Sequence, residues 1–359
     1  IRPLTQAAYA AYQSNRAIFT AKDFSVDPDL ITQIGYLVKD VQVSRLQPEQ
    51  RYLVPHRTFL EFLTAKYLAL AEQDERDAWL SELKDHWERE VITEFIWGLI
   101  EDEEKTHMAD VVMDATEFKE MGESDDCPPS HLMLRLIGGM NQVPEEMKEV
   151  IAQHLPTRIS LYFNCSAACV DGATVLFGVI SKVKPTALHR IRFNERNVGS
   201  ALWMAAEHLR IQSFQWGLPY HLMMTDDEVE AASRTIATWV ALKEFTIDGL
   251  LSSGLSREHL RQLIQSLVHC SQLETLQLKG IKVQDEGMDI IGALLITSIP
   301  HLKQLNLRDN NLTSKGLRRL KDCLAQRTTK INTLDVSWNK YDAAVVKDLK
   351  EVCDRLFYE

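Results

Sequence analysis

Hydrophobic and polar positions repeat with a fixed period through the C-terminal third of the chain. Three six-residue segments share one alternation of apolar and polar residues, at 273–278, 302–307 and 331–336. Their central leucines, Leu276, Leu305 and Leu334, are 29 residues apart each time. Successive side chains of a strand point to opposite faces. The apolar positions are therefore predicted to enter a core, and the polar residues between them to point outward.

Asparagines follow these segments at the same period. Asn310 and Asn339 each lie three residues after the last apolar position of a segment, where an amide side chain can bond the turning backbone of neighbouring coils. Between the segments, apolar residues such as Leu317, Leu320 and Leu324 have helical spacing. The pattern resembles the L-x-x-L-x-L-x-x-N-x-L consensus of leucine-rich repeats, which predicts an α/β solenoid with one strand and one helix per repeat.

Weaker copies of the template extend upstream, at 158–163, 188–193, 211–216 and 242–247. The register of the most upstream copy is ambiguous by two residues. We therefore expect the repeat array to occupy residues 156–359. The last apolar pattern, from Val345 to Phe357, predicts a helix that caps the end of the array.

Residues 1–155 lack this period and are predicted to be mainly α-helical. Helices are expected at 4–18 and 30–37, and the alternation around 38–54 predicts a small β-wing. The acidic stretch 117–126, which leads into Pro128 and Pro129, predicts a flexible loop. The expected domains are 1–68, 69–155 and 156–359.

One motif of the N-terminal half matches a known family. Residues 52–68 resemble the F-x-H-x-[ST]-F-x-E-F-x-A-A-x-Y-L motif that closes the winged-helix domain of NACHT-type NLR innate immune receptors, with departures at Val54 and Thr64. Residues 92–99 resemble the Phe-x-x-Gly-Leu signature of the helical domain that follows in that family. Residues 132–136 resemble the helix that leads into its ribonuclease-inhibitor-like repeats. The resemblance covers nearly the whole chain in the family's order.

This resemblance implies a nucleotide-sensing role for His56. In the family, a nucleotide lies between an ATPase domain and the winged helix, whose histidine reaches the phosphates; His56 matches that histidine. Without the resemblance, a cap of the helix that begins near Phe59 is the simpler interpretation. The Walker A loop G-x-x-x-x-G-K-[ST] is absent from the 359 residues. The chain is therefore expected to be non-catalytic and to hold no cofactor itself, with ADP or ATP bound in the full-length receptor.

Charge and cysteine content narrow the partners and the compartment. The net charge of −11 makes nucleic acid a poor partner, and the sequence contains neither a membrane span nor a signal peptide. Six dispersed cysteines indicate reduced thiols in the cytoplasm. Cys165 and Cys169 are four residues apart with no second Cys or His pair at zinc spacing, which predicts no metal site. The start at Ile1 without a methionine indicates a piece of a longer protein.

Outward strand positions are the candidate binding residues, because repeat proteins usually bind through the concave sheet. The set comprises Arg192, Gln215, Thr246, Lys279, Lys303, Asn306, Arg308, Asp335 and Trp338. Lys279, Lys303 and Arg308 are expected to form a basic patch in an otherwise acidic protein. Trp338, after the last repeat strand, has the character of an interface anchor. A solvated face that binds nothing is the competing interpretation.

Two functions of different classes follow. The first is the sensor and autoinhibitory half of a cytoplasmic NLR receptor, which a protein or pathogen-derived ligand releases from a closed state. The resemblance then implies contact with an upstream nucleotide-binding domain and self-oligomerisation of the full-length protein on activation. The second is a stand-alone leucine-rich-repeat inhibitor or scaffold resembling ribonuclease inhibitor. The motif around His56 separates the two, because a pure scaffold needs no winged helix.

Overall fold

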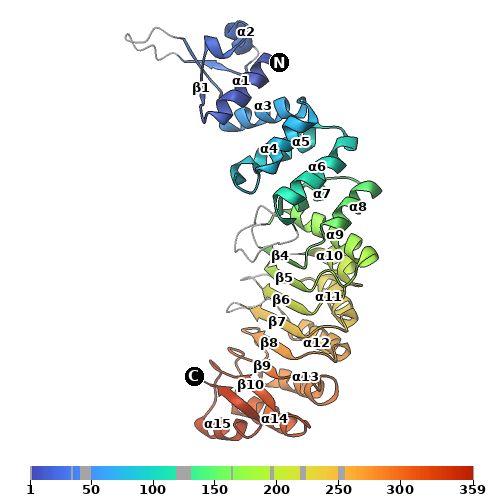
Figure 1. Cartoon of the computed structure of the whole chain (residues 1–359). Helices are drawn as coiled ribbons and strands as arrows, with labels where there is room; N and C mark the ends of the chain where they lie inside the picture. The colour runs from blue at the N-terminus through green and yellow to red at the C-terminus, as the bar shows by residue number, and fades with distance from the viewer. Residues whose placement is uncertain are drawn as a thin grey trace. The chain divides into compact units, whose positions relative to one another are not determined.

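The computed structural model describes residues 2–33, 35–40, 50–118, 131–162, 165–194, 198–218, 224–249 and 255–358. The chain divides into two compact units, Ile1–Glu117 and Phe118–Glu359. Both are drawn in Figure 1. The acidic loop expected at 117–126 falls outside the described residues from position 119 onward, and so does the tip of the expected β-wing at 41–49.

The first unit is mainly helical with one small sheet. Its elements are α1 (Arg2–Gln13), β1 (Ile18–Thr20), η1 (Ala21–Asp23), α2 (Pro28–Gln33), β2 (Val38–Lys39), β3 (Arg51–Leu53), α3 (Arg57–Ala69), α4 (Gln73–Ser81), η2 (Trp87–Arg89), α5 (Glu90–Leu99) and α6 (Asp102–Ala115). The strands form an antiparallel sheet in the order β1-β3-β2. Leu4, Phe19, Tyr52 and Leu63 are buried together in one core, which joins α1, the sheet and α3.

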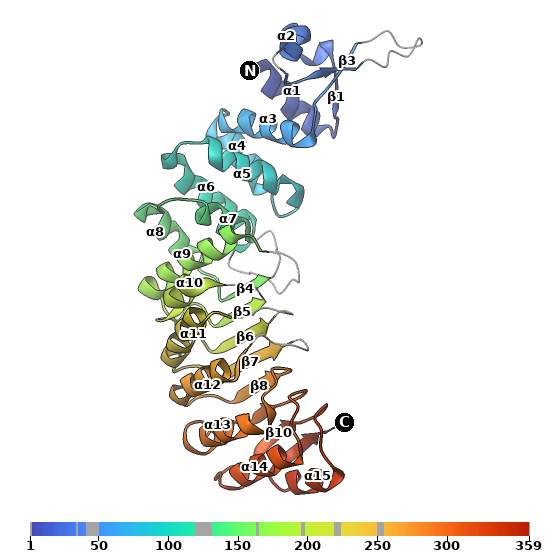
Figure 2. The same ribbon diagram turned by 180° about the vertical axis from the view of Figure 1, so that it is seen from behind.

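The second unit alternates strands and helices. Its elements are α7 (Leu132–Gly138), α8 (Glu145–Gln153), β4 (Arg158–Tyr162), α9 (Ala167–Val183), β5 (Arg190–Asn194), α10 (Gly199–Ala206), β6 (Ser213–Leu218), α11 (Asp226–Thr238), β7 (Glu244–Gly249), α12 (Arg257–Ser266), η5 (Leu267–His269), β8 (Thr275–Lys279), α13 (Gln284–Thr297), β9 (Gln304–Asn306), α14 (Ser314–Ala325), β10 (Ile331–Asp335), α15 (Ala343–Leu349) and β11 (Cys353–Phe357). Figure 2 shows the helices stacked along one side of the strands.

The eight strands found among the described residues of this unit form one parallel sheet in chain order, from β4 to β11. Leu276, Leu305 and Leu334 are in register across β8, β9 and β10, and none of them is exposed to solvent. The 29-residue period is therefore the repeat of the solenoid, and the strands expected upstream at 158, 188, 211 and 242 correspond to β4, β5, β6 and β7.

The C-terminal end differs from the prediction. Val345–Phe357 was expected to be a single capping helix, but only Ala343–Leu349 is helical, and Cys353–Phe357 adds β11 to the sheet beside β10. The edge backbone of β10 explains the difference, because its N–H and C=O groups gain partners when one more strand pairs with them. The short helix leaves enough chain to return to the sheet.

The boundary between the two compact units falls after Glu117, and the domain boundaries expected at 68 and 155 remain predictions. The helices α7 and α8 belong to the second unit, and residues up to 117 form the first. The cause is a close backbone approach between α7 and α9. A Cβ atom on Gly138 would lie 1.9 Å from the carbonyl oxygen of Ala168, and one on Gly172 would lie 2.0 Å from that of Leu134. Only glycine at both positions permits this packing.

The two repeat asparagines confirm the predicted turn chemistry. Asn310 is fully buried, and its Oδ1 accepts hydrogen bonds from the backbone N–H groups of Ile281 and Val283, both at 3.2 Å. Its Nδ2 donates to the carbonyl oxygens of Leu278 and Arg308. Asn339 bonds the coil that precedes it in the same way, since its Oδ1 accepts hydrogen bonds from the N–H groups of Asn310 and Leu312.

Candidate interaction surface

Five of the predicted binding residues lie in a single row across the outer face of the sheet. The strand register places Arg192 beside Gln215, Gln215 beside Thr246, and Asn306 beside Asp335. Gln277 fills the gap between Thr246 and Asn306, and Phe357 follows Asp335 on β11. The row thus joins β5 to β11 in one continuous polar strip that ends in an aromatic side chain.

Phe357 is a member of the row that the sequence did not predict. It was placed in a capping helix, so its position beside Asp335 could not be inferred. Cys353, Asp354, Arg355 and Leu356 follow one another as apolar, polar, polar and apolar, a spacing that fits a helix and lacks the alternation of a strand, so the sequence carries no clear signal for β11. The side chain of Phe357 is 54% exposed.

The expected basic patch does not form. Lys279 and Arg308 lie at the carboxyl ends of neighbouring strands, where the N–H of Gly280 donates to the carbonyl oxygen of Arg308. Lys303 precedes β9 and therefore lies at the other end of the strands. Parallel strands in register bring their corresponding ends together. Lys303, before β9, and Arg308, after β9, therefore lie at opposite ends of the sheet.

Acidic neighbours also neutralise both lysines. The Nζ of Lys303 is 2.7 Å from Oε2 of Glu274, and that contact holds the pKa of the Glu274 carboxyl below its ordinary value. The Nζ of Lys279 is 3.8 Å from Oδ2 of Asp248. These ion pairs leave the outer face without a concentrated positive charge at those two positions.

An aromatic cluster lies at the C-terminal end of the same face. We call Arg308, Trp338, Phe357 and Tyr358 the C-terminal aromatic cluster. The guanidinium of Arg308 stacks 4.5 Å from the ring centroid of Trp338, whose side chain is 64% exposed. These residues, with Asp335, line a hollow of about 320 Å³. Large exposed aromatic side chains next to an arginine are the composition of interface anchors.

The backbone of Trp338 supports a role outside folding. Its φ is +60°, and the equivalent turn positions 29 and 58 residues earlier are Asp309, with φ +55°, and Gly280, with φ +62°. A left-handed conformation costs an ordinary L-residue about 1–2 kcal/mol. A bulky tryptophan at a turn that glycine occupies elsewhere therefore gives up stability, and strain of this kind is concentrated at functional sites.

Replacing Trp338 by glycine is expected to leave the free energy of unfolding within about 1 kcal/mol of wild type, because relief of the strained φ offsets the lost Arg308 stacking. Asp309→Gly is the matched control, since it makes the same backbone change one repeat earlier. The measurement is urea unfolding of both variants. A loss above about 2 kcal/mol in Trp338→Gly alone would make Trp338 a structural anchor instead.

His56 lies in the first unit as the N-cap of α3. Its Nδ1 accepts a hydrogen bond from the N–H of Thr58 at 3.2 Å and lies 2.9 Å from the Thr58 hydroxyl oxygen. An accepting Nδ1 places the proton of the neutral ring on Nε2. The residue is exposed, so Nε2 is a hydrogen-bond donor available to a molecule outside the unit. The capping role that the sequence left open is therefore real, and it does not exclude contact with a nucleotide.

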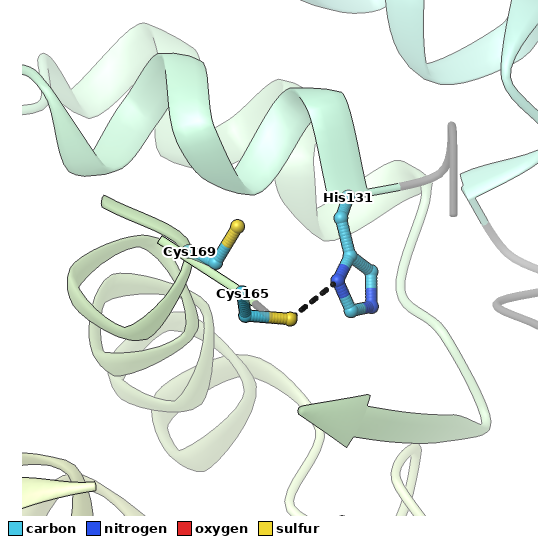
Figure 3. A group of neighbouring side chains, drawn as sticks. All are labelled: His131, Cys165 and Cys169. Carbon is cyan, nitrogen blue, oxygen red and sulfur yellow. Dashed lines mark hydrogen bonds between the residues drawn. The ribbon is translucent and has the colours of Figure 1, made fainter. Parts of the chain in front are cut away.

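A group that could hold a metal ion lies at the beginning of the second unit. Folding brings His131 beside Cys165 and Cys169, and their donor atoms all lie within 4.8 Å of one another (Figure 3). The sequence expectation of no metal site considered the cysteine pair alone. His131 is 34 residues before Cys165, a separation that no local spacing rule detects.

A hollow on the helical side of the second unit is lined by none of the predicted binding residues. It measures about 770 Å³ and lies between α8 and α9, where Lys148, Glu149 and Lys182 line it beside apolar residues. A protein that binds through extended sheet contacts does not require its partner to fill such a hollow.

Comparison with known proteins supports the repeat. A family model described as "Leucine Rich repeat" matches residues 298–321, which include β9 and the first part of α14. No match was found among curated proteins. A matching crystal structure, of a protein from Bacteroides fragilis, is 14% identical with a TM-score of 0.28, covering 56% of this chain and 73% of that one. A likeness this distant carries no argument about function.

The chain therefore contains a leucine-rich repeat within an α/β unit whose eight strands form one parallel sheet. Repeats of this kind present an extended surface for binding other proteins. Among the described residues, no helix is both long and apolar enough to cross a membrane.

Proposed function

We propose that this chain is the non-catalytic sensor and autoinhibitory part of a NACHT-type NLR receptor in the cytoplasm. One observation carries the proposal: the motif at 52–68 and a leucine-rich repeat occur in a single chain, in the order of that family. The first unit supports the proposal, because β2 and β3 form an antiparallel pair within the segment 38–54, where the sequence predicts a β-wing.

In this proposal, the repeats bind a protein partner through the polar row and the C-terminal aromatic cluster. The row offers side-chain amides and hydroxyls to a partner surface, and the cluster supplies exposed aromatic area for anchoring. Contact between this face and another part of the receptor would hold the closed state. A ligand that binds the same face more tightly then shifts the equilibrium towards the open state.

His56 provides the test in the complete receptor. Its Nε2–H is expected to donate to a phosphate of bound ADP and so to favour the closed state. Loss of a charge-assisted hydrogen bond costs about 1–3 kcal/mol, which raises the ratio of open to closed receptor by about 5- to 150-fold. His56→Leu should therefore signal without ligand and copurify with less ADP. The isolated chain, which lacks a Walker A loop, should bind no nucleotide tightly.

His56→Asn is the matched control, because asparagine preserves the cap of α3 but is too short to extend beyond it. High basal signalling in both variants supports contact with the phosphate. Wild-type signalling and full ADP retention in His56→Asn would reduce His56 to its cap. That result would favour the second candidate, a stand-alone leucine-rich-repeat inhibitor or scaffold, for which the cap geometry of His56 is sufficient.

A further inference from the structure

His131, Cys165 and Cys169 come from segments that meet where the second unit begins. His131 is the residue before α7. Cys165 directly precedes Ser166, the residue that caps α9, and Cys169 lies in the first turn of that helix. The Nδ1 of His131 lies 3.4 Å from the Sγ of Cys165, and Figure 3 shows that ring and thiol pointing toward each other with Cys169 beside them. His131 and Cys169 are fully buried and Cys165 is partly buried. Neither cysteine forms a disulfide.

The donor atoms have nearly the spacing of a zinc site. With Zn–S bonds of about 2.3 Å and Zn–N bonds of about 2.0 Å, a tetrahedral ion holds its donors about 3.5–3.8 Å apart. The His131–Cys165 pair, at 3.4 Å, matches this distance. The three donors lie within 4.8 Å of one another, so the widest pair closes by at most about 1 Å, which a small χ1 rotation achieves.

The chemistry of the donors selects the ion. Two sulfur atoms and one imidazole nitrogen favour zinc, whereas magnesium and calcium require oxygen ligands. Two thiolates balance the two positive charges of the ion, which removes most of the cost of burying it. The positive end of the dipole of α9 also stabilises negative charge on the sulfur of Cys169, in the first turn of that helix.

We propose that His131, Cys165 and Cys169 bind one zinc ion, which fastens the start of α7 to the start of α9. Both thiols lose their protons on binding, so each ion releases two protons, and the neutral imidazole binds through Nδ1. The fourth tetrahedral position is left to a further ligand. Terminal repeats of a solenoid need a cap, and the ion would hold the two packed helices that close the first repeat.

The test uses the full 359-residue chain, reduced and freed of metal. Zinc titrated against a chromophoric chelator should bind with a stoichiometry of one per chain and release two protons per ion. Cobalt in place of zinc should give the intense visible bands of a tetrahedral ion and thiolate charge-transfer absorption. Cobalt bands of octahedral intensity, or zinc binding without proton release, would overturn the proposal.

Variants locate the ion. Cys165→Ser should weaken zinc binding by more than about 100-fold, since substitutions that only support a ligand already cost 10–100-fold. Cys323→Ser is the matched control, because Cys323 is also partly buried but lies on α14, away from the group. Equal affinity in Cys165→Ser and wild type, or loss of binding in Cys323→Ser, would contradict the assignment.

A measurement on wild-type protein covers the case in which Cys165→Ser does not fold. Zinc should protect the partly buried Cys165 from alkylation, as read by peptide mass spectrometry, and leave the rate at Cys323 unchanged. Cys270 serves as an internal reference for an unreactive thiol, since burial raises its pKa to about 12. An unchanged alkylation rate of Cys165 at saturating zinc would refute the site.

Discussion

Replacing Leu305 by alanine is expected to lower the free energy of unfolding of the repeat unit by about 2–5 kcal/mol. Leu305 is fully buried and lies between Leu276 and Leu334 in the ladder of β8, β9 and β10. The strands are fixed by their hydrogen bonds, so the neighbours cannot collapse into the cavity. Because each repeat is stabilised by the next, hydrogen exchange should quicken throughout the C-terminal repeats.

The neighbouring positions are the controls for Leu305. Gln304 is exposed and its substitution by alanine should be nearly silent. Asn306 is half-exposed and its Nδ2 donates to Asp335 at 3.1 Å, so Asn306→Ala should cost at most about 1 kcal/mol. Equal losses in Leu305→Ala and Asn306→Ala, measured by urea unfolding, would mean that the strand register is wrong.

Asn310→Ala is expected to lower the free energy of unfolding by about 3–5 kcal/mol, as much as Leu305→Ala, although it removes no hydrophobic contact. The substitution leaves the N–H groups of Ile281 and Val283 without their acceptor in a buried turn, and each buried unsatisfied group costs about 1–3 kcal/mol. The hydrogen bonds that are lost are those of the N–H groups of Ile281 and Val283. These two amides should therefore exchange with deuterium much faster than in wild type.

Asn332→Ala is the matched control for Asn310, since Asn332 is an exposed asparagine of β10. Its substitution should change stability by less than about 0.5 kcal/mol. If Asn310→Ala were no more damaging than Asn332→Ala, or left the exchange of Ile281 and Val283 unchanged, the hydrogen bonds of Asn310 would not stabilise the coil.

The repeat array could be predicted from the sequence because its period fixes both strand register and turn chemistry. Leu276, Leu305 and Leu334 differ by one repeat length, and parallel strands of equal repeats pair in register, so a linear pattern becomes a spatial row. Asn310 and Asn339 followed from the same period. The end of the array could not be predicted in this way, since β11 pairs with β10 after only 22 residues, Leu334 to Leu356.

Long-range contacts of side chains were beyond the sequence. The basic patch failed because Glu274 and Asp248, which neutralise Lys303 and Lys279, come from the preceding repeats. The contact between His131 and Cys165 was also not predictable, because only the packing of α7 on α9 brings these two residues together. Period and motif specify which residues share a face, whereas the partners of each side chain depend on neighbouring repeats.

We propose that this chain belongs to a nucleotide-regulated receptor, as opposed to a stand-alone scaffold. The most direct test is to determine the coding sequence upstream of Ile1 in the full-length transcript. We expect an open reading frame that continues upstream and encodes a strand, a G-x-x-x-x-G-K-[ST] loop and a helix, the elements that cradle nucleotide phosphates. A reading frame that begins close to Ile1, or an upstream region without that loop, would contradict the receptor and leave the scaffold.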